Sequence, residues 1–150
     1  MRVLIDTCVI MDDLFNREPF HENARIIADA VANCSIRGYL NTNAVANIYY
    51  LLHKHTHNDK LSREIINKLF KLYDIVDTTR NDCKMALLSQ MSDYEDAILV
   101  ETAKRLELEL IVTRNIDDFK KSDVFAMTPE DFVMYLRENS YIWYIDSIRL

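Results

Sequence analysis

Short runs of strand-forming residues alternate along the sequence with longer segments of helical periodicity. The runs predict strands at 3–5, 36–40, 75–76 and 110–113. Apolar residues recur at helical spacing elsewhere, and the predicted helical segments are 9–15, 21–34, 42–52, 61–72, 80–90, 93–108 and a last helix from Thr128. Strands that alternate with helices form parallel sheets covered by helices on both faces. We therefore predict an α/β fold.

The composition favours a single compact domain. Of the 150 residues, 49% are apolar, and one glycine with two prolines are too few for an all-β fold with many turns. We expect one domain over 1–150 that ends in an apolar tail at 139–150. The three cysteines form no CxxC pair, the N-terminus lacks a signal-peptide pattern, and no apolar stretch approaches the length of a membrane span. The expectation is a cytoplasmic protein with reduced thiols.

Acidic and amide side chains are predicted to meet at one edge of this sheet. Open parallel sheets bind ligands at the carboxyl ends of their strands. Asp6 follows the first strand, and Asn47 lies in the first turns of the helix after the second strand. The helix at 93–108 runs antiparallel to the strand after it, so its N-terminus reaches the same edge. That N-terminus and the end of the last strand add Asp93, Glu95, Asp96, Asn115, Asp117 and Asp118.

Such a cluster is unfavourable unless a cation occupies it, because like charges a few Å apart repel by roughly several kcal/mol. Oxygen ligands suit Mg²⁺ or Mn²⁺, and no His or Cys is predicted to fall in the cluster and favour zinc. These ions support phosphoryl displacement, which is nuclease chemistry. The net charge of -6 argues against a generic nucleic-acid binder but leaves room for an enzyme of this kind.

Each of these residues also has a structural interpretation. Asp6 or Thr7 could cap the next helix, and Ser92 with Glu95 fits the S-x-x-E capping box. Asp96 in a first helical turn would interact favourably with the helix dipole, and Asn115 or Asp118 could cap a short turn. His53 and His57 have the spacing of helical metal ligands, but their place near a helix C-terminus favours a structural role.

Three segments in order resemble PIN domains: Val3-Leu4-Ile5-Asp6-Thr7, Glu95-Asp96-Ala97 and Ile111-Val112-Thr113-Arg114-Asn115. The continuations Asp117-Asp118-Phe119 and Thr128-Pro129-Glu130-Asp131-Phe132 resemble one bacterial branch of that family, and the similarity covers about 2–136. The resemblance implies a three-layer α/β/α fold, an acidic Mg²⁺ or Mn²⁺ pocket and RNA cleavage. In the branch of bacterial toxins it also implies a homodimer and an antitoxin partner.

The resemblance assigns roles position by position. Asp6 matches the first family carboxylate and Asp96 the third, whereas the second aligns with Asn47 and the fourth with Asn115. It thereby implies catalytic roles for Asp6, Asp96, Asp118 and Glu95, metal binding by Asp6, Asp96, Asp118 and Asn115, and substrate binding by Thr7, Asn47, Thr113 and Arg114.

Other acidic α/β proteins fit the sequence less well. Phosphotransferases of the haloacid dehalogenase type need Asp-x-Asp after the first strand, where this chain has Asp6-Thr7-Cys8. Phosphorylation receivers need a Lys after a late strand, where this chain has Arg114. The main alternative is a catalytically weakened PIN fold that binds RNA or protein, because Asn47 and Asn115 replace two carboxylates.

Overall fold

The computed structural model describes residues 1–142 and contains a five-stranded sheet whose strands all run parallel. The strand order is β3-β2-β1-β4-β5. The strands are β1 (Arg2–Ile5), β2 (Arg37–Asn41), β3 (Asp74–Val76), β4 (Leu110–Val112) and β5 (Ala126–Met127). The helices are α1 (Thr7–Leu14), α2 (His21–Ala32), α3 (Thr42–Thr56), α4 (Asp59–Leu72), α5 (Arg80–Ala86), α6 (Tyr94–Arg105), the 3₁₀ turn η1 (Ile116–Phe119) and α7 (Pro129–Glu138).

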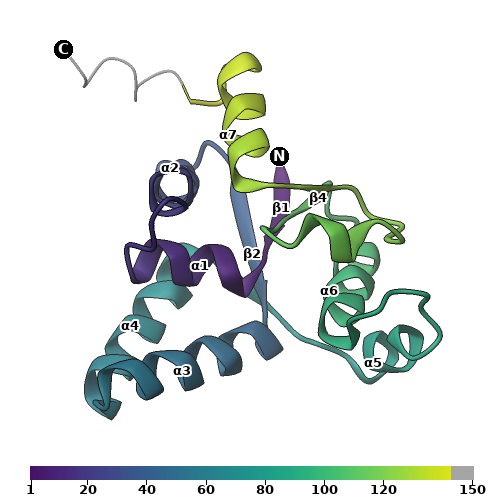
Figure 1. Cartoon of the computed structure of the whole chain (residues 1–150), viewed down its shortest axis with the longest axis horizontal. Coiled ribbons are helices and arrows are strands. Elements are labelled where there is room, and N and C mark those ends of the chain that lie inside the picture. Colours follow the sequence, from purple (N-terminus) through teal and green to yellow (C-terminus); the bar gives the residue numbers. More distant parts are fainter. Residues whose placement is uncertain (143–150) are drawn as a thin grey trace.

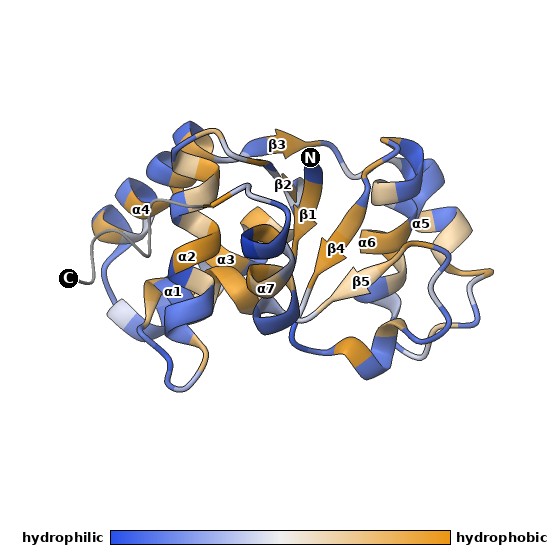
Figure 2. Cartoon of the chain, turned by 90° about the horizontal axis from the view of Figure 1, so that it is seen from above, coloured by the Kyte–Doolittle hydropathy of each residue, from blue (hydrophilic) through white to orange (hydrophobic). Residues whose placement is uncertain are grey.

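Helices cover both faces of the sheet, which confirms the predicted three-layer α/β/α fold (Figure 1). Val3 and Ile5 of β1 face one layer, built from α1, α2, α3, α4 and α7, while Leu4 faces α6 on the other side. The same alternation holds in β4, where Ile111 packs with Leu4. The strands β1 and β4 are therefore apolar on both faces, as their orange colour in Figure 2 shows, and this explains the continuous apolar runs of the sequence at 3–5 and 110–112.

The chain reverses its direction of growth across the sheet at β1. It adds β2 and then β3 on one side of β1, and afterwards places β4 and β5 on the other side. The carboxyl ends of β1 and β4 thus form a topological switch point, which is the position where open α/β sheets bind ligands. Ile5 pairs with Val112 at this edge, so Asp6 and Thr113 follow two neighbouring strands in register.

Several predicted boundaries were wrong in detail. The second strand begins and ends one residue later than 36–40, and α5 and α6 are shorter than the predicted helices at 80–90 and 93–108. The short strand β5 was not predicted. Its two residues pair with Ile111 and Val112, so tertiary context rather than local pattern defines it. Thr128 caps α7 and Pro129 begins it, as predicted.

The predicted apolar tail at 139–150 is described only as far as Ile142. Tyr141 stacks against Tyr135, and Ile142 lies in the core with 2% of its surface exposed. Residues 143–150 lie outside the described part of the chain. Within the described part, every helix is too short or too polar to cross a membrane.

Candidate active site

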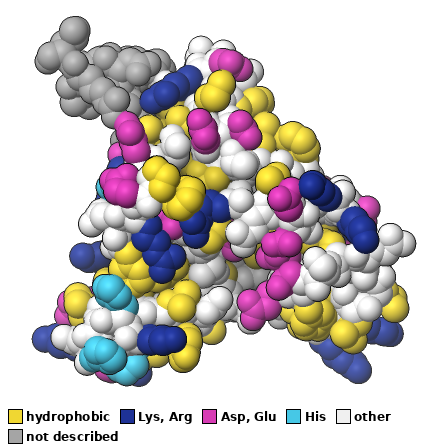
Figure 3. Space-filling view, in the orientation of Figure 1, with side chains coloured by type: hydrophobic (Ala, Val, Ile, Leu, Met, Phe, Trp, Pro, Cys, Tyr) yellow, Lys and Arg dark blue, Asp and Glu magenta, His cyan; other side chains and the backbone are white. Residues whose placement is uncertain are grey.

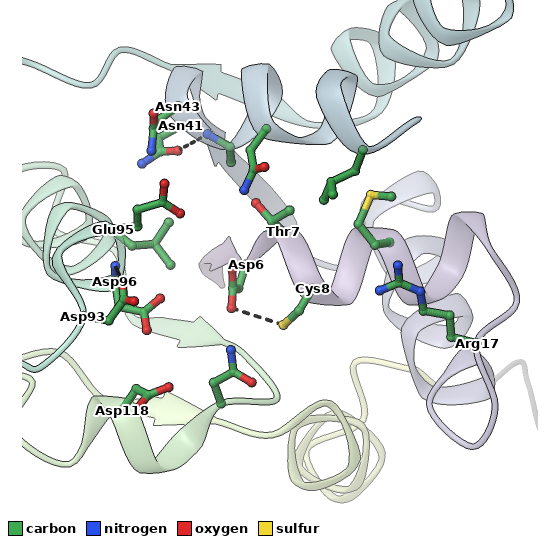
Figure 4. Close-up of a pocket in the computed structure, with 16 residues that line it drawn as sticks. Asp6, Thr7, Cys8, Arg17, Asn41, Asn43, Asp93, Glu95, Asp96 and Asp118 are labelled. Atoms are coloured by element: carbon green, nitrogen blue, oxygen red, sulfur yellow. Dashed lines mark hydrogen bonds between the residues drawn. The ribbon is translucent and has the colours of Figure 1, made fainter. Parts of the chain in front are cut away.

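One pocket lies at the carboxyl edge of the sheet, around the switch point between β1 and β4 (Figure 4). Its walls come from the start of α1, the first turns of α3, the N-terminus of α6 and the segment after β4. The predicted site residues that line it are Asp6, Thr7, Asn47, Glu95, Asp96, Asn115 and Asp118. The structure thus brings together the segments that the strand order was expected to bring together. Their catalytic and metal-binding roles remain predictions.

Hydrogen bonds with β4, with the residue after β4 and with α1 fix the position of Asp6. Its backbone N–H donates to the carbonyl of Val112 (3.0 Å) and so extends the β1–β4 pairing by one residue. The Thr113 hydroxyl donates to Asp6 Oδ2 (2.7 Å), and the Cys8 thiol donates to the same oxygen (3.1 Å). Asp6 occupies the N-cap position of α1 without a side-chain capping bond. The helix-capping interpretation is therefore not supported for this carboxylate, which faces the pocket.

Cys8 lines the pocket, so the expectation that no Cys would fall in the cluster was wrong. Cys8 is one residue into α1 and turns back toward Asp6. Burial and the neighbouring Asp6 carboxylate raise the pKa of the Cys8 thiol to about 12. The thiol stays protonated at neutral pH and donates to Asp6. It therefore supports Asp6 and does not argue for zinc, which binds thiolate.

The N-terminus of α6 supplies the acidic wall of the pocket. Asp93 is the N-cap, and its Oδ1 accepts from the backbone N–H of Asp96 (3.0 Å). The predicted capping box of Ser92 and Glu95 is wrong, because helix α6 begins one residue later than that box requires. Glu95 has no capping bond to make, and Figure 4 shows it directed into the pocket together with Asp96.

The N-terminus of α3 supplies a wall of neutral amides. Asn41 caps this helix by accepting from the N–H of Ala44 (2.8 Å). Asn41 is the last residue of β2 and directly follows the predicted strand at 36–40, much as Asp6 follows β1. This shared position was a signal that could have identified it. Asn43 and Asn47 line the pocket beside it.

Three predicted residues after β4 have different surroundings from those expected. Thr113 is completely buried, and its hydroxyl both donates to Asp6 and accepts from the Asn115 N–H (3.1 Å), so it positions the site from behind. Arg114 lines a neighbouring cavity instead of the acidic pocket. Asp117 pairs with Lys120 at the surface (2.7 Å). Asn115 makes no side-chain cap to η1, which leaves its amide at the pocket.

Repulsion among the carboxylates is the main electrostatic property of the site. Burial first, and then the neighbouring carboxylates of Asp6, Asp93, Asp118 and Glu95, together raise the pKa of Asp96 to about 7. Magenta side chains gather along one side of the central hollow in Figure 3. Within residues 1–142, no three His, Cys, Asp or Glu side chains stand in a geometry that would hold a metal ion. The donors are nevertheless oxygen atoms of the kind that Mg²⁺ and Mn²⁺ prefer, and a cation would relieve the repulsion at Asp96.

The comparisons with known proteins agree with this fold. The PIN domain family matches residues 2–117, and the chain belongs to the PIN-domain family. No curated protein sequence matches the chain.

Several solved structures share the architecture at low sequence identity. VapBC2 from Rickettsia felis, bound to a DNA fragment from its promoter, matches with a TM-score of 0.64 and 12% identity over 85% of this chain and 98% of that chain. A toxin–antitoxin complex from Klebsiella pneumoniae matches with a TM-score of 0.62 and 19% identity over 85% of this chain and 97% of that chain. Mycobacterium tuberculosis VapC20, a toxin that cleaves the sarcin–ricin loop, matches with a TM-score of 0.61 and 10% identity over 82% of this chain and 98% of that chain. At these identities the likeness establishes the shared fold.

Asp96 predicts a pH dependence of stability in metal-free solution. Its pKa in the folded protein lies above the ordinary value of 3.8, so the folded state holds the proton more tightly than the unfolded state. The stability that this group contributes is present below about pH 4 and is lost as the pH rises toward 7. We expect the loss to be about 2 kcal/mol after screening by solvent and salt. Urea unfolding in EDTA at pH 5 and pH 8 measures the part of this loss that falls between these two pH values.

The variant Asp96→Asn should abolish most of this pH dependence and be the more stable protein at pH 8. Asp117→Asn serves as the matched control, since Asp117 is an exposed carboxylate outside the pocket. An Asp96→Asn protein that keeps the full pH dependence would contradict the assignment.

Proposed function

We propose that this protein is a metal-dependent endoribonuclease and the toxin component of a toxin–antitoxin pair. The observation that carries the proposal is the pocket of mutually repelling carboxylates at the β1–β4 switch point, in a chain that belongs to the PIN-domain family. Repulsion of this size is a cost to stability, and a functional cation accounts for its presence.

The proposed metal ligands are Asp6 and Asp96, with Asp118 and Asn115 next to them and Glu95 as a further carboxylate. Bound Mg²⁺ or Mn²⁺ would stabilise the charge that develops on a phosphodiester and make a water molecule more acidic. The protein's own contribution is to hold Asp6 through Thr113 and Cys8, and to hold Asp96 at the first turn of α6 through Asp93. Thr7 and Asn47 line the same pocket and offer hydrogen-bond donors to the RNA. Thr113 is buried, so it would affect RNA binding only indirectly, by holding Asp6 in position.

The toxin role is supported by the structural likeness to VapBC2 and to the Klebsiella pneumoniae toxin–antitoxin complex. An antitoxin protein is therefore the proposed partner, and the cytoplasm the proposed location. A small DNA-binding protein encoded beside this chain would support the pairing. Unhindered bacterial growth during strong expression of this chain without that neighbour would contradict it.

A catalytically weakened PIN fold that binds RNA or protein is the second candidate. The neutral wall formed by Asn41, Asn43 and Asn47 favours it, because an amide oxygen attracts a divalent cation less strongly than a carboxylate does. The number of carboxylates on the opposite wall favours catalysis.

RNA cleavage by the wild-type chain tests the proposal directly. With Mg²⁺ or Mn²⁺ and a single-stranded RNA of mixed sequence, we expect cleavage that EDTA stops. Asp6→Asn and Asp96→Asn should each reduce the rate by about 100-fold or more, since each removes a charge placed at the reacting phosphate. Titration calorimetry should show weaker Mn²⁺ binding in both variants, and Asp117→Asn should match the wild type. Equal Mn²⁺ affinity and cleavage in wild type and Asp96→Asn would refute the proposed site.

Asn47→Glu separates the two candidate functions. It adds a carboxylate at the position where the PIN family has its second acidic residue, and it should tighten Mn²⁺ binding by about tenfold and raise cleavage. Ala46→Glu is the control, because it adds the same charge to α3 at an exposed position that does not line the acidic pocket. No gain in Asn47→Glu over Ala46→Glu would show that Asn47 does not occupy the second acidic position.

We also propose that the chain forms a homodimer through its C-terminal tail. Tyr141 and Ile142 pack on their own domain, but the remaining sequence carries Trp143, Tyr144, Ile145, Ile148 and Leu150 outside the described residues. Apolar side chains in such number favour burial against a second copy. Sedimentation equilibrium at tens of micromolar should give a dimer for the full chain and a weaker or absent dimer for a chain ending at Ile142. A monomeric full chain at this concentration excludes a constitutive homodimer.

A further inference from the structure

Asp12 is a buried carboxylate that the proposed reaction does not use. It lies on the core side of α1, two turns from Asp6, and none of its side chain is exposed. Within the described residues, neither of its oxygens accepts a hydrogen bond. Two cations approach it instead: Arg114 Nε lies 2.9 Å from Oδ2, and Arg17 Nη1 lies 3.9 Å from Oδ1.

The two arginines come from different segments, the turn after α1 and the stretch that follows β4. Arg17 belongs to the turn after α1, where its backbone N–H donates to the Asp12 carbonyl (3.0 Å), and its side chain lines the acidic pocket. Arg114 directly follows Thr113, the residue that holds Asp6, and lines the cavity next to the pocket. Its guanidinium lies 4.2 Å from the ring centroid of Phe20, so an aromatic face fixes it from one side.

The exposure of this cluster is one-sided. Asp12 is fully buried, but the side chains of Arg17 and Arg114 keep 43% and 27% of their surface exposed. A buried carboxylate without a partner costs several kcal/mol, so the two guanidinium groups are needed to compensate it. One negative charge faces two positive charges, which leaves an excess of about one positive charge directed to solvent. The outer guanidinium N–H groups remain available as donors in that direction.

The excess positive charge lies next to a pocket that is otherwise acidic. The acidic wall formed by Asp93, Glu95, Asp96 and Asp118 repels a polyanion, and the whole chain is negative. Dark-blue Lys and Arg side chains lie across the central hollow from the magenta ones in Figure 3. An RNA strand with one phosphate among the carboxylates can place a neighbouring phosphate against the arginines. Arginine suits this because its planar fork binds two phosphate oxygens.

We propose that Asp12 is a positioning residue that holds Arg17 and Arg114 as a phosphate-binding pair for single-stranded RNA. Arg17 lines the acidic pocket, and Arg114 lines the cavity that also contains Phe20, so the pair joins the linings of the two cavities. This inference rests on RNA being the substrate of the proposed function. Its test uses binding without cleavage, so that the two can fail separately.

The decisive variant is Asp12→Asn, because charge and position predict opposite signs for it. If only net charge mattered, removal of a negative charge would tighten RNA binding. If Asp12 holds the arginines in place, its replacement should weaken binding by about fivefold although the protein has become less negative. The measurement is fluorescence anisotropy of a single-stranded RNA oligonucleotide in Ca²⁺, which supplies charge to the carboxylates with a looser geometry than Mg²⁺. Binding that is unchanged or tighter in a folded Asp12→Asn protein would overturn the inference.

Substitutions of the arginines keep the test valid if Asp12→Asn does not fold. Arg17→Ala and Arg114→Lys should each weaken binding by about three- to tenfold, and Arg17→Ala should lower the salt slope by about 0.7, as expected for one phosphate contact to a single strand. Arg37→Ala is the control, since Arg37 is exposed, pairs with Asp74 and begins β2 at the opposite edge of the sheet. Wild-type affinity in both Arg17→Ala and Arg114→Lys would overturn the inference.

A double variant and a cleavage assay separate positioning from other roles. Asp12→Asn should weaken binding much less in an Arg17→Ala, Arg114→Lys background, because the groups it positions are already altered. An equal loss in both backgrounds would show a structural role only. Cleavage with Mn²⁺ is then measured on the same proteins. The variants could change RNA binding as expected while the wild type cleaves no RNA. That result would reject the ribonuclease proposal and support the phosphate-binding pair.

Discussion

The pairing of β1 with β4 places the ends of two strands side by side, and the hydrogen bond from Thr113 to Asp6 joins them there. Thr113 is fully buried, and its hydroxyl also accepts from the Asn115 N–H, so one side chain sets the geometry of both segments. The other walls of the pocket are arranged around this point by α3 and α6. A shift of register between β1 and β4 would separate Asp6 from the carboxylates of α6 and remove the site.

The pocket contains both mutually repelling carboxylates and neutral amides. In its acidic wall, burial and the neighbouring carboxylates raise the pKa of Asp96 to about 7. The wall from α3 carries the neutral side chains of Asn41, Asn43 and Asn47. Fewer carboxylates reduce the repulsion and also weaken the attraction for a divalent cation. The charge of this pocket is therefore intermediate between that of a strongly charged nuclease site and that of a neutral binding pocket. The arginine pair held by Asp12 adds positive charge next to the carboxylates.

The sequence predicted the sheet, its layers and the convergence of Asp6, Asn47, Asp96 and Asn115, because strand order and helix direction depend on patterns that local residues carry. It did not predict β5, which exists only through its pairing with β4. Nor did it predict the cap at Asn41, since strand β2 ends one residue later than its apolar pattern does. Cys8 and Arg17 were missed for a different reason. Their contribution comes from side-chain direction across a turn, which spacing alone does not show.

In the proposed site a divalent cation binds between Asp6 and Asp96. The most direct measurement is anomalous diffraction from crystals soaked in Mn²⁺ near neutral pH. We expect an anomalous peak within about 2.0–2.4 Å of an oxygen of each of these carboxylates, with Asp118, Asn115 or Glu95 beside it. No peak in the pocket, or a peak held by His53 and His57 instead, would rule out a cation site between Asp6 and Asp96.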